Sequence, residues 1–344
     1  MLALVHSYTK SQFSELLSAK KTWSARLLLA PRATGFRALA AASAADPKHN
    51  VMGVGVGEKL KNGKPTGVMA VRFLVRRKYA ENELAKTEML PKSIDGLPAD
   101  VEEVGVFRAF MRKKLRPSGP LPNPKARYRP AQPGCSVGFQ FPAPSQLVMA
   151  GTFGALAKDA GGTYLLSNNH VLADEGRLSA GADIFQPGLL DGGSSSSDKI
   201  AKLTRFIPLQ TGVLNEVDCA LAKTNTASLV SHDILHIGAP AGVAAAAIDM
   251  RVHKFGRTTS YTVGHITSVA TDVTVGYETG NFTFENQIII VGDNGPFSAA
   301  GDSGSLILDR QSNNAVALLF AGSNTHTIAN HLTKALQALK VTLA

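Results

Sequence analysis

The sequence has few cysteines and no long hydrophobic segment. Only Cys135 and Cys219 occur among 344 residues, so the chain can form at most one disulfide. Such sparse cysteine is ordinary in a reducing compartment, and we expect free thiols and a cytoplasmic location. The longest apolar runs, such as 315–321, fall far short of the ~20 residues that a membrane helix needs. We therefore expect no membrane span, and we find no pattern typical of a secretory signal.

Charge is unevenly distributed along the chain. Residues 1–130 contain 24 lysines and arginines against 10 acidic residues, whereas residues 131–344 contain 12 against 16. A basic patch is the electrostatic footprint of a nucleic-acid binder. Such a patch becomes specific when it comes with aromatic motifs, zinc-ligand spacing or a helix-turn-helix pattern, and we find none of these in the sequence. We therefore expect a solvated basic face and no nucleic-acid partner.

The front of the chain divides into two parts by pattern. Residues 1–45 have apolar positions at helical spacing and predict an N-terminal helical segment. Residues 46–110 predict a small α+β module. Within it, alternating apolar residues over 51–75 with an Asn-Gly turn predict a β-hairpin, 81–90 predicts a short helix, and 100–107 predicts another strand.

A basic, proline-rich stretch separates this front part from the rest. Between residues 112 and 134 there are seven arginines or lysines and six prolines, which disfavour both helix and sheet. We expect residues 111–134 to be a linker. Residues 135–344 contain many short β-rich stretches separated by Gly, Ser, Asn and Asp, which is typical of barrels or sandwiches. The sequence thus predicts a mainly β domain that ends in a C-terminal helix over 328–339.

Three short segments of this β domain carry residues of catalytic type, in the order His170, Asp218 and Ser303. Each lies where an apolar strand meets a turn. A serine hydroxyl is a weak nucleophile near neutral pH. It needs an imidazole to accept its proton and a carboxylate to orient and stabilise that imidazole. The combination predicts nucleophilic catalysis by Ser303.

The segment around Ser303 is the most specific of the three. Gly301 and Gly304 bracket the serine, and a tight glycine-rich turn can direct the backbone N–H groups of Gly301 and Ser303 to one point. The negative oxygen of a tetrahedral intermediate would be bound at that point. We therefore expect these two amides to form an oxyanion hole.

The order His, Asp, Ser and the GDSG turn at 301–304 resemble the chymotrypsin-like (trypsin-like) serine peptidases. This order excludes α/β-hydrolases, in which the serine comes first. The resemblance covers residues 134–342 and implies two β-barrels with a catalytic triad in the cleft between them. The implied activity is peptide-bond hydrolysis with no metal or organic cofactor. LLSNNHVLA at 165–173 and LLFAGS at 318–323 look like the bacterial and plant narrow-leaf-type trypsin-like proteins in particular.

The same resemblance assigns residues to substrate binding. The segment 318–323 would supply the strand along which an extended substrate pairs, with Ala321 and Gly322 lining the pocket wall. Phe297 falls at the base of the pocket for the P1 side chain, which precedes the bond to be cut. An aromatic residue there cannot pair with Arg or Lys, so we expect small or apolar P1 side chains.

Two alternatives concern the aspartates. Asp198 and Asp233 are rivals to Asp218, but Asp198 lies in a Ser/Gly-rich loop that we expect to be too mobile to orient an imidazole. Trypsin-like enzymes that mature by cleavage pair the aspartate before the nucleophile, here Asp302, with a new N-terminal amine. We see no typical activation sequence ahead of Cys135. Asp302 therefore needs another partner, such as backbone amides.

The sequence thus predicts a two-barrel serine endopeptidase that acts on protein or peptide substrates. The alternative is a latent or inactive protein with a protease fold that binds peptides or serves as an assembly scaffold. In that case the front module or neighbouring subunits would close the cleft. The family resemblance also implies a homo-oligomer.

Overall fold

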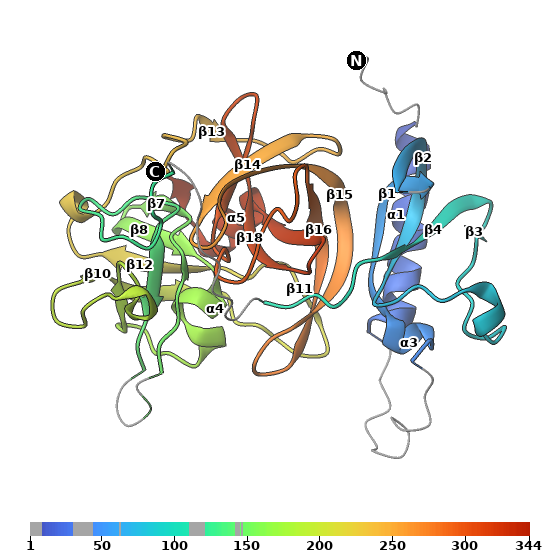
Figure 1. The fold of residues 1–344 in the computed structure, drawn as a ribbon, viewed down its shortest axis with the longest axis horizontal. Coiled ribbons are helices and arrows are strands. Elements are labelled where there is room, and N and C mark those ends of the chain that lie inside the picture. The colour runs from blue at the N-terminus through green and yellow to red at the C-terminus, as the bar shows by residue number, and fades with distance from the viewer. Residues whose placement is uncertain (1–8, 30–43, 62, 110–120, 142–144, 146) are drawn as a thin grey trace.

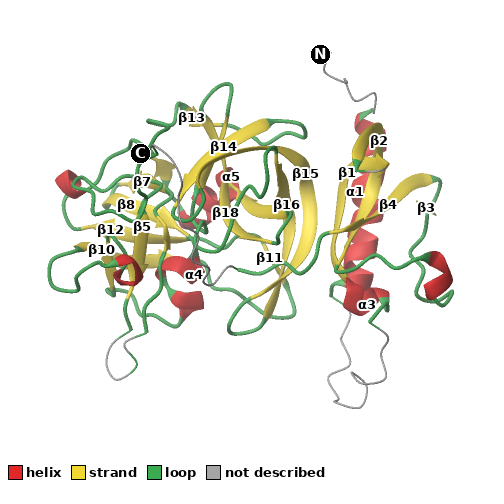
Figure 2. Ribbon diagram, viewed as in Figure 1, coloured by secondary structure: helices red, strands yellow, loops and turns green. Residues whose placement is uncertain are grey.

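A computed structural model describes residues 9–29, 44–61, 63–109, 121–141, 145 and 147–344. Two curled sheets lie side by side, and the strands of the N-terminal part, backed by one long helix, extend the second of them (Figure 1). Strands and loops dominate this arrangement, as Figure 2 shows. The expected mainly β, two-barrel fold behind a helix and a small α+β part is confirmed. None of the described helices is long and apolar enough to cross a membrane.

The first barrel is an antiparallel sheet with the strand order β20-β7-β8-β12-β10-β9-β5-β6. Most of its strands come from the first half of the β domain, and β20 brings the end of the chain back to β7. The strands are β5 (Ser136–Phe139), β6 (Gly151–Thr152), β7 (Ala155–Asp159), β8 (Gly162–Ser167), β9 (Asp183–Phe185), β10 (Lys199–Phe206), β12 (Ala220–Thr224) and β20 (Thr342–Leu343). A short helix, α4 (Asn169–Leu172), follows β8.

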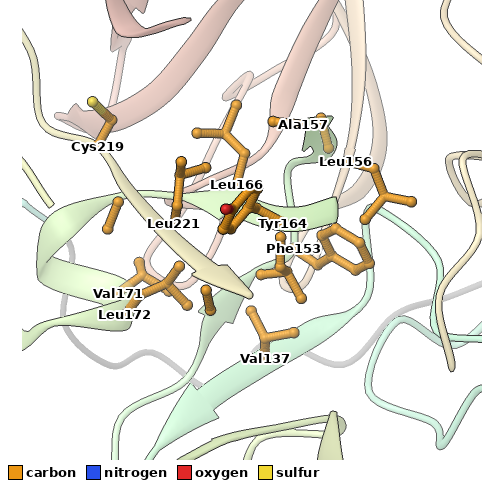
Figure 3. Packing of buried hydrophobic residues seen from close by; sticks show 14 of the residues in the cluster. Val137, Phe153, Leu156, Ala157, Tyr164, Leu166, Val171, Leu172, Cys219 and Leu221 are labelled. Carbon is orange, nitrogen blue, oxygen red and sulfur yellow. The ribbon is translucent and has the colours of Figure 1, made fainter. Parts of the chain in front are cut away.

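The interior of the first barrel is a continuous apolar cluster. Phe153, Leu166, Leu172 and Leu221 come from different elements and converge on one core, which Figure 3 shows from close by. Each is almost fully buried, and burying such a side chain stabilises the fold by about 1.5–3 kcal/mol. Cys219 lies in the same cluster, and both cysteines are buried and free. This packing fixes α4 and the start of β12, which carry the candidate site.

The second barrel closes because β15 pairs with both β14 and β16. The ring continues through β19, β18 and β17 back to β14. The strands are β14 (Arg251–Gly256), β15 (Ser260–Gly276), β16 (Asn281–Gly292), β17 (Leu306–Asp309), β18 (Asn314–Gly322) and β19 (His326–His331), with the short β11 (Leu214–Asn215) and β13 (Gly242–Val243) attached in parallel. Helix α5 (Leu332–Leu339) buries residues at positions i, i+3, i+4 and i+7 against the barrels, as its apolar spacing predicts. The expected start of this helix at residue 328 is wrong, because residues 328–331 belong to β19, which pairs with β16 and β18.

The front of the chain adds its own strands to the second barrel's sheet. Strand β1 (Val51–Lys61) pairs with β15 on one edge and with β2 (Lys64–Val75) on the other, and β2 forms the expected hairpin with it. The remaining elements are α1 (Lys10–Leu27), α3 (Pro47–Asn50), β3 (Ser93–Ile94) and β4 (Leu97–Glu103). Helix α1 packs on β1 and β2, and its Lys20 forms a buried ion pair with Asp272 of β15 at 2.5 Å. The two parts therefore share a single sheet.

Some local expectations for the front part are wrong or lie outside the described residues. The expected helix over 81–90 is only a 3₁₀ turn at Glu81–Glu83. None of the side chains at 81–90 is buried, and a short helix without a packing surface is marginal in water. The rest of the expected helical segment beyond α1, residues 1–8 and 30–43, lies outside the described residues.

The described end of the linker lies along the first barrel. Arg127 and Arg129 both contact Asp198, at 2.7 and 3.0 Å, and Arg129 also donates to the side chain of Gln186. The carboxylate of Asp198 is buried, so our expectation of a mobile Asp198 loop is wrong. Asp198 anchors the linker instead of orienting an imidazole. Residues 111–120 of the predicted linker lie outside the described residues.

Candidate active site

His170 lies at the corner where β8 ends and α4 begins, and its ring contacts Asp218. Nδ1 of His170 is 2.6 Å from Oδ2 of Asp218, and both side chains are buried. The other carboxylate oxygen accepts from the backbone amide of Asn169 at 2.7 Å. The side chain of Asn168 donates to the backbone carbonyl of Asp218 at 2.8 Å. Because Asp218 just precedes β12, which pairs with β8, sheet pairing itself brings histidine and aspartate together.

A residue that sequence reasoning missed also binds Asp218. The hydroxyl of Tyr277 donates to Oδ2 of Asp218 at 2.8 Å, and its ring meets the His170 ring edge-on, with centroids 5.7 Å apart. Burial, assisted by the charge of Asp218, raises the pKa of Tyr277 well above its ordinary value. Tyr277 therefore remains a neutral hydrogen-bond donor. It follows β15 at the tip of a long hairpin, 59 residues from Asp218, and no sequence motif marks it.

Ser303 lies in a turn ahead of β17 that only glycine can form at both ends. Gly301 and Gly304 have φ angles of +97° and +93°, a region that other residues rarely adopt. A Cβ on Gly304 would meet Oγ of Ser167 at 2.1 Å, so the turn lies directly against the strand that leads to His170. The backbone carbonyl of Ser303 accepts from Thr152 of the first barrel at 2.8 Å. The turn thus sits at the seam between the barrels.

In this turn the hydroxyl of Ser303 makes a hydrogen bond, whereas the amides of Gly301 and Ser303 make none among the described residues. Oγ of Ser303 donates to the carbonyl of Phe320 at 3.3 Å, and Nε2 of His170 has no hydrogen-bond partner among the described residues. Within that part of the chain, no hydrogen bond is found from the amide of Gly301 or of Ser303. The imidazole is free to accept a proton at Nε2, and the two amides are free to bind an anionic oxygen.

Asp302 is fixed without an N-terminal amine. One carboxylate oxygen accepts from the amides of Thr258 and Thr259, at 2.8 and 3.1 Å. The other accepts from the Thr259 hydroxyl at 2.7 Å and the Ala299 amide at 2.9 Å. Nζ of Lys254 lies 3.5 Å away, and both charged side chains are fully buried. Backbone amides were expected here, whereas the buried Lys254 was not.

The lysine is held in that position by further contacts. Nζ of Lys254 donates to the Thr259 hydroxyl at 2.5 Å and lies 5.8 Å from the centre of the Phe297 ring. Burial lowers the pKa of Lys254, and the carboxylate of Asp302 opposes that shift. A buried cation is costly unless it is paired and hydrogen-bonded, so lysine and aspartate require each other. Together they hold the turn that carries Ser303.

The residues expected to bind substrate lie in two places. Ala321 and Gly322 are at the end of β18, next to the Phe320 carbonyl that Ser303 contacts. Phe297 is buried in the core of the second barrel with Val252, Ile266 and other aliphatic residues. Its position at the base of a P1 pocket stays a prediction. Among the described residues, no three His, Cys, Asp or Glu side chains are grouped as they would be to hold a metal ion.

Comparisons with known proteins give structural neighbours only. A scan for known protein families finds no match, and a search of the curated proteins finds none. Thermobifida fusca protease A is 18% identical over 60% of this chain and 95% of its own, with a TM-score of 0.43. Cellulomonas bogoriensis chymotrypsin is 19% identical over 56% and 90%, with a TM-score of 0.39. A glutamic-acid-specific serine protease is 19% identical over 62% and 100%, with a TM-score of 0.41.

Similarity at this level assigns no activity to the chain, and the chemistry of the site has to be argued from its own geometry. The closer likeness to narrow-leaf-type proteins stays a prediction.

Proposed function

We propose that this protein is a serine endopeptidase that hydrolyses peptide bonds with His170, Asp218 and Ser303. The observation that carries the proposal is the 2.6 Å contact between His170 and Asp218. The contact leaves Nε2 of the same ring without a partner among the described residues. The glycine-bounded turn of Ser303 packs against the end of the strand that leads to His170. A carboxylate on one ring nitrogen and a free second nitrogen are what general-base catalysis by histidine requires.

The steps follow from these positions. The Ser303 hydroxyl leaves the Phe320 carbonyl, gives its proton to Nε2 of His170 and attacks the substrate carbonyl carbon. Asp218 stabilises the imidazolium, while the amides of Gly301 and Ser303 bind the oxyanion. Collapse of the intermediate breaks the C–N bond, and His170 protonates the leaving amine. Water then repeats the sequence on the acyl-enzyme and restores Ser303.

The groups of this site suffice to accelerate hydrolysis strongly. General acid–base catalysis by a positioned histidine contributes about 10²–10⁴-fold. Each oxyanion-hole donor contributes about 2.7–4 kcal/mol of transition-state stabilisation. No metal or organic cofactor has a part in these steps.

The proposal extends to specificity, substrate class, location and assembly. Small or apolar P1 side chains are supported by Phe297, which provides no carboxylate to pair with a basic residue. Peptides or proteins are the substrates. A cytoplasmic location agrees with two free, buried cysteines, and a homo-oligomer is proposed on family resemblance alone.

One observation favours the alternative, a latent protein with a protease fold. The side chains of His170 and Ser303 are only 2% and 1% exposed, so this structure shows the site covered. A permanently covered site could serve peptide binding or assembly but not turnover.

A fluorophosphonate probe and a peptide library separate the two functions. Such a probe labels an activated serine in an open site. We expect wild type to be labelled and to cleave the library. Ser303→Ala should do neither and retain its circular dichroism spectrum, while Ser312→Ala, at an exposed turn, should behave as wild type. Equal cleavage by wild type and Ser303→Ala would overturn the peptidase proposal, and a folded wild type with no labelling and no cleavage would favour the latent protein.

A further inference from the structure

A short strand of the chain's own backbone pairs with the end of β18, two residues from the Phe320 carbonyl that the Ser303 hydroxyl contacts. After β4 the chain crosses from the N-terminal sheet to the second barrel, as the teal trace in Figure 1 shows. There Arg108 and Gly322 form a reciprocal antiparallel pair, in which each amide donates to the other's carbonyl at 3.1 Å. On the other edge Gly276 pairs with the same strand, through its carbonyl to the Ala109 amide and its amide to the Phe107 carbonyl, both at 3.1 Å.

The strand follows the path expected for a bound substrate. An extended peptide that joins a sheet edge forms backbone hydrogen bonds with it, and the segment 318–323 was expected to offer that edge. Because the pairing with Gly322 is antiparallel, the direction from Phe107 to Ala109 runs toward Phe320. The Phe320 carbonyl is the group that contacts the Ser303 hydroxyl. The strand thus points its C-terminal side at the nucleophile.

Side chains alternate along the strand and define two binding positions. Arg108 is exposed, whereas Phe107 and Ala109 are buried on the other side. Phe107 is fully buried in a cluster that includes Phe284, Phe320 and other residues of the second barrel. The barrel therefore provides a pocket that fits a large aromatic side chain. It also provides room for a small side chain two positions closer to Ser303.

The opposite face of the strand is less tightly held. A hollow of about 430 Å³ lies between residues 103–108 and the loop 322–325. The strand is tied at its start by Glu102, which contacts His326 at 3.2 Å and pairs with Arg72. The amide of Val104 also donates to the Val75 carbonyl at 2.9 Å. Beyond these anchors, the backbone pairs and the buried side chains of Val104, Phe107 and Ala109 hold it. These are interactions that a separate peptide of similar sequence could replace.

We infer that Phe107–Ala109, at the end of the segment Val104–Ala109, is a resident strand in the peptide-binding groove, and that the groove selects extended peptides with an aromatic residue followed two positions later by a small one. The inference rests on the proposed function for its identification of the groove with the substrate site. Substrates and the chain's own strand compete for the same backbone partners at Gly322.

The test uses binding and does not need turnover. The probe is a fluorescein-labelled peptide with the sequence of residues 104–109, Val-Gly-Val-Phe-Arg-Ala. Fluorescence anisotropy measures its binding to the protein. All chains carry Ser303→Ala so that nothing is hydrolysed. Arg108→Pro removes the amide that donates to Gly322 but changes no buried side chain. Arg108→Ala keeps both backbone bonds and is the matched control.

We expect Arg108→Pro to bind the probe about tenfold or more tighter than the Arg108→Ala control, because a tethered strand competes at about millimolar effective concentration. A probe with serine in place of phenylalanine should bind about tenfold more weakly to the same variant. Equal affinity of both chains for the probe, or of one chain for both probes, would overturn the inference.

A second variant covers the case in which Arg108→Pro does not fold. It replaces residues 104–109 by alternating glycine and serine, and the unlabelled peptide should raise its Tm. If neither variant folds, or if the peptide leaves Tm unchanged, the strand is a fixed part of the barrel and the inference is wrong. If the chain that keeps Ser303 binds the peptide but does not hydrolyse it, the inference about the groove holds and the peptidase proposal is wrong.

Discussion

The two halves of the candidate site are each organised by a buried carboxylate, and the two carboxylates have different partners. Asp218 of the first barrel binds an imidazole that can gain a proton, together with the neutral hydroxyl of Tyr277. Asp302 of the second barrel binds amides, a hydroxyl and the ammonium of Lys254. Asp218 is placed to stabilise the imidazole of His170 when that ring gains a positive charge. Asp302 holds a turn in which no group has to change its charge.

The largest expected effect comes from neutralising the carboxylate of the first half. Asp218→Asn keeps the shape of the side chain but favours the wrong tautomer of His170. We expect kcat to fall about 10⁴-fold, as for a triad whose orienting carboxylate is lost. Steady-state hydrolysis of a peptide substrate measures it. A loss smaller than tenfold would show that Asp218 is structural, as Asp302 is.

The next effect concerns the cation of the second half. Lys254→Met fills the same space without charge and leaves Asp302 buried without its cation. We expect the free energy of unfolding to fall by about 3–5 kcal/mol. We expect kcat to fall about 10²–10³-fold as the oxyanion turn loosens.

Denaturant unfolding and hydrolysis assays measure the two effects of Lys254→Met. The matched control is Lys334→Met, because Lys334 pairs with Glu216 at the surface and its loss should change neither the free energy of unfolding nor kcat appreciably. Equal effects of the two substitutions would contradict a special role for the buried pair.

A smaller effect is expected from Tyr277, which acts on His170 only through Asp218. Tyr277→Phe removes one hydrogen bond to the carboxylate, and we expect kcat to fall about three- to tenfold with KM unchanged. Tyr261→Phe is the control, because its hydroxyl bonds His253 and not the site. A change in KM alone would show that Tyr277 shapes the groove and does not position Asp218.

The two halves should also respond with opposite sign to alkaline pH. The pKa of Tyr277 is raised by burial, so its contribution to stability is complete below about pH 10 and is lost as the pH rises through the folded-state value. The pKa of Lys254 is lowered by burial, so its contribution is complete above about pH 10.5 and is lost as the pH falls through the folded-state value.

Unfolding free energies of wild type, Tyr277→Phe and Lys254→Met between pH 8 and 11 test this pair of signs. Each substitution should remove a slope of at most about 1.4 kcal/mol per pH unit, and the two slopes should have opposite directions. Parallel curves for all three proteins would show that neither group titrates differently in the folded state.

The sequence predicts the residues of the site that lie in local patterns. His170, Asp218 and Ser303 each follow or precede a strand, and the strand pairing of β8 with β12 explains why two of them meet. Glycines at 301 and 304 are readable because a turn with positive φ requires them. The mainly β class follows from the same alternation of short strands and turns, whereas the two-barrel arrangement was expected from the resemblance to chymotrypsin-like peptidases.

The remaining features depend on contacts between residues far apart in the chain. Tyr277 reaches Asp218, and Arg108 reaches Gly322, only through the closure of the second barrel. Lys254 looks in the sequence like any basic residue of a strand, and its partner is 48 positions away. The expected helix at 81–90 does not form because local helix propensity alone does not stabilise a short helix, and this segment buries none of its side chains.

The pairing of β1 with β15 determines how an N-terminal truncation of this protein would behave. Residues 53–56 cover the hydrogen-bonding edge of residues 270–273. A shortened chain that starts at residue 135 would expose that edge to solvent, with unpaired N–H and C=O groups that can bind another chain. Such fragments should precipitate or stick together during purification, and the N-terminal module is best retained when crystals or assays are planned.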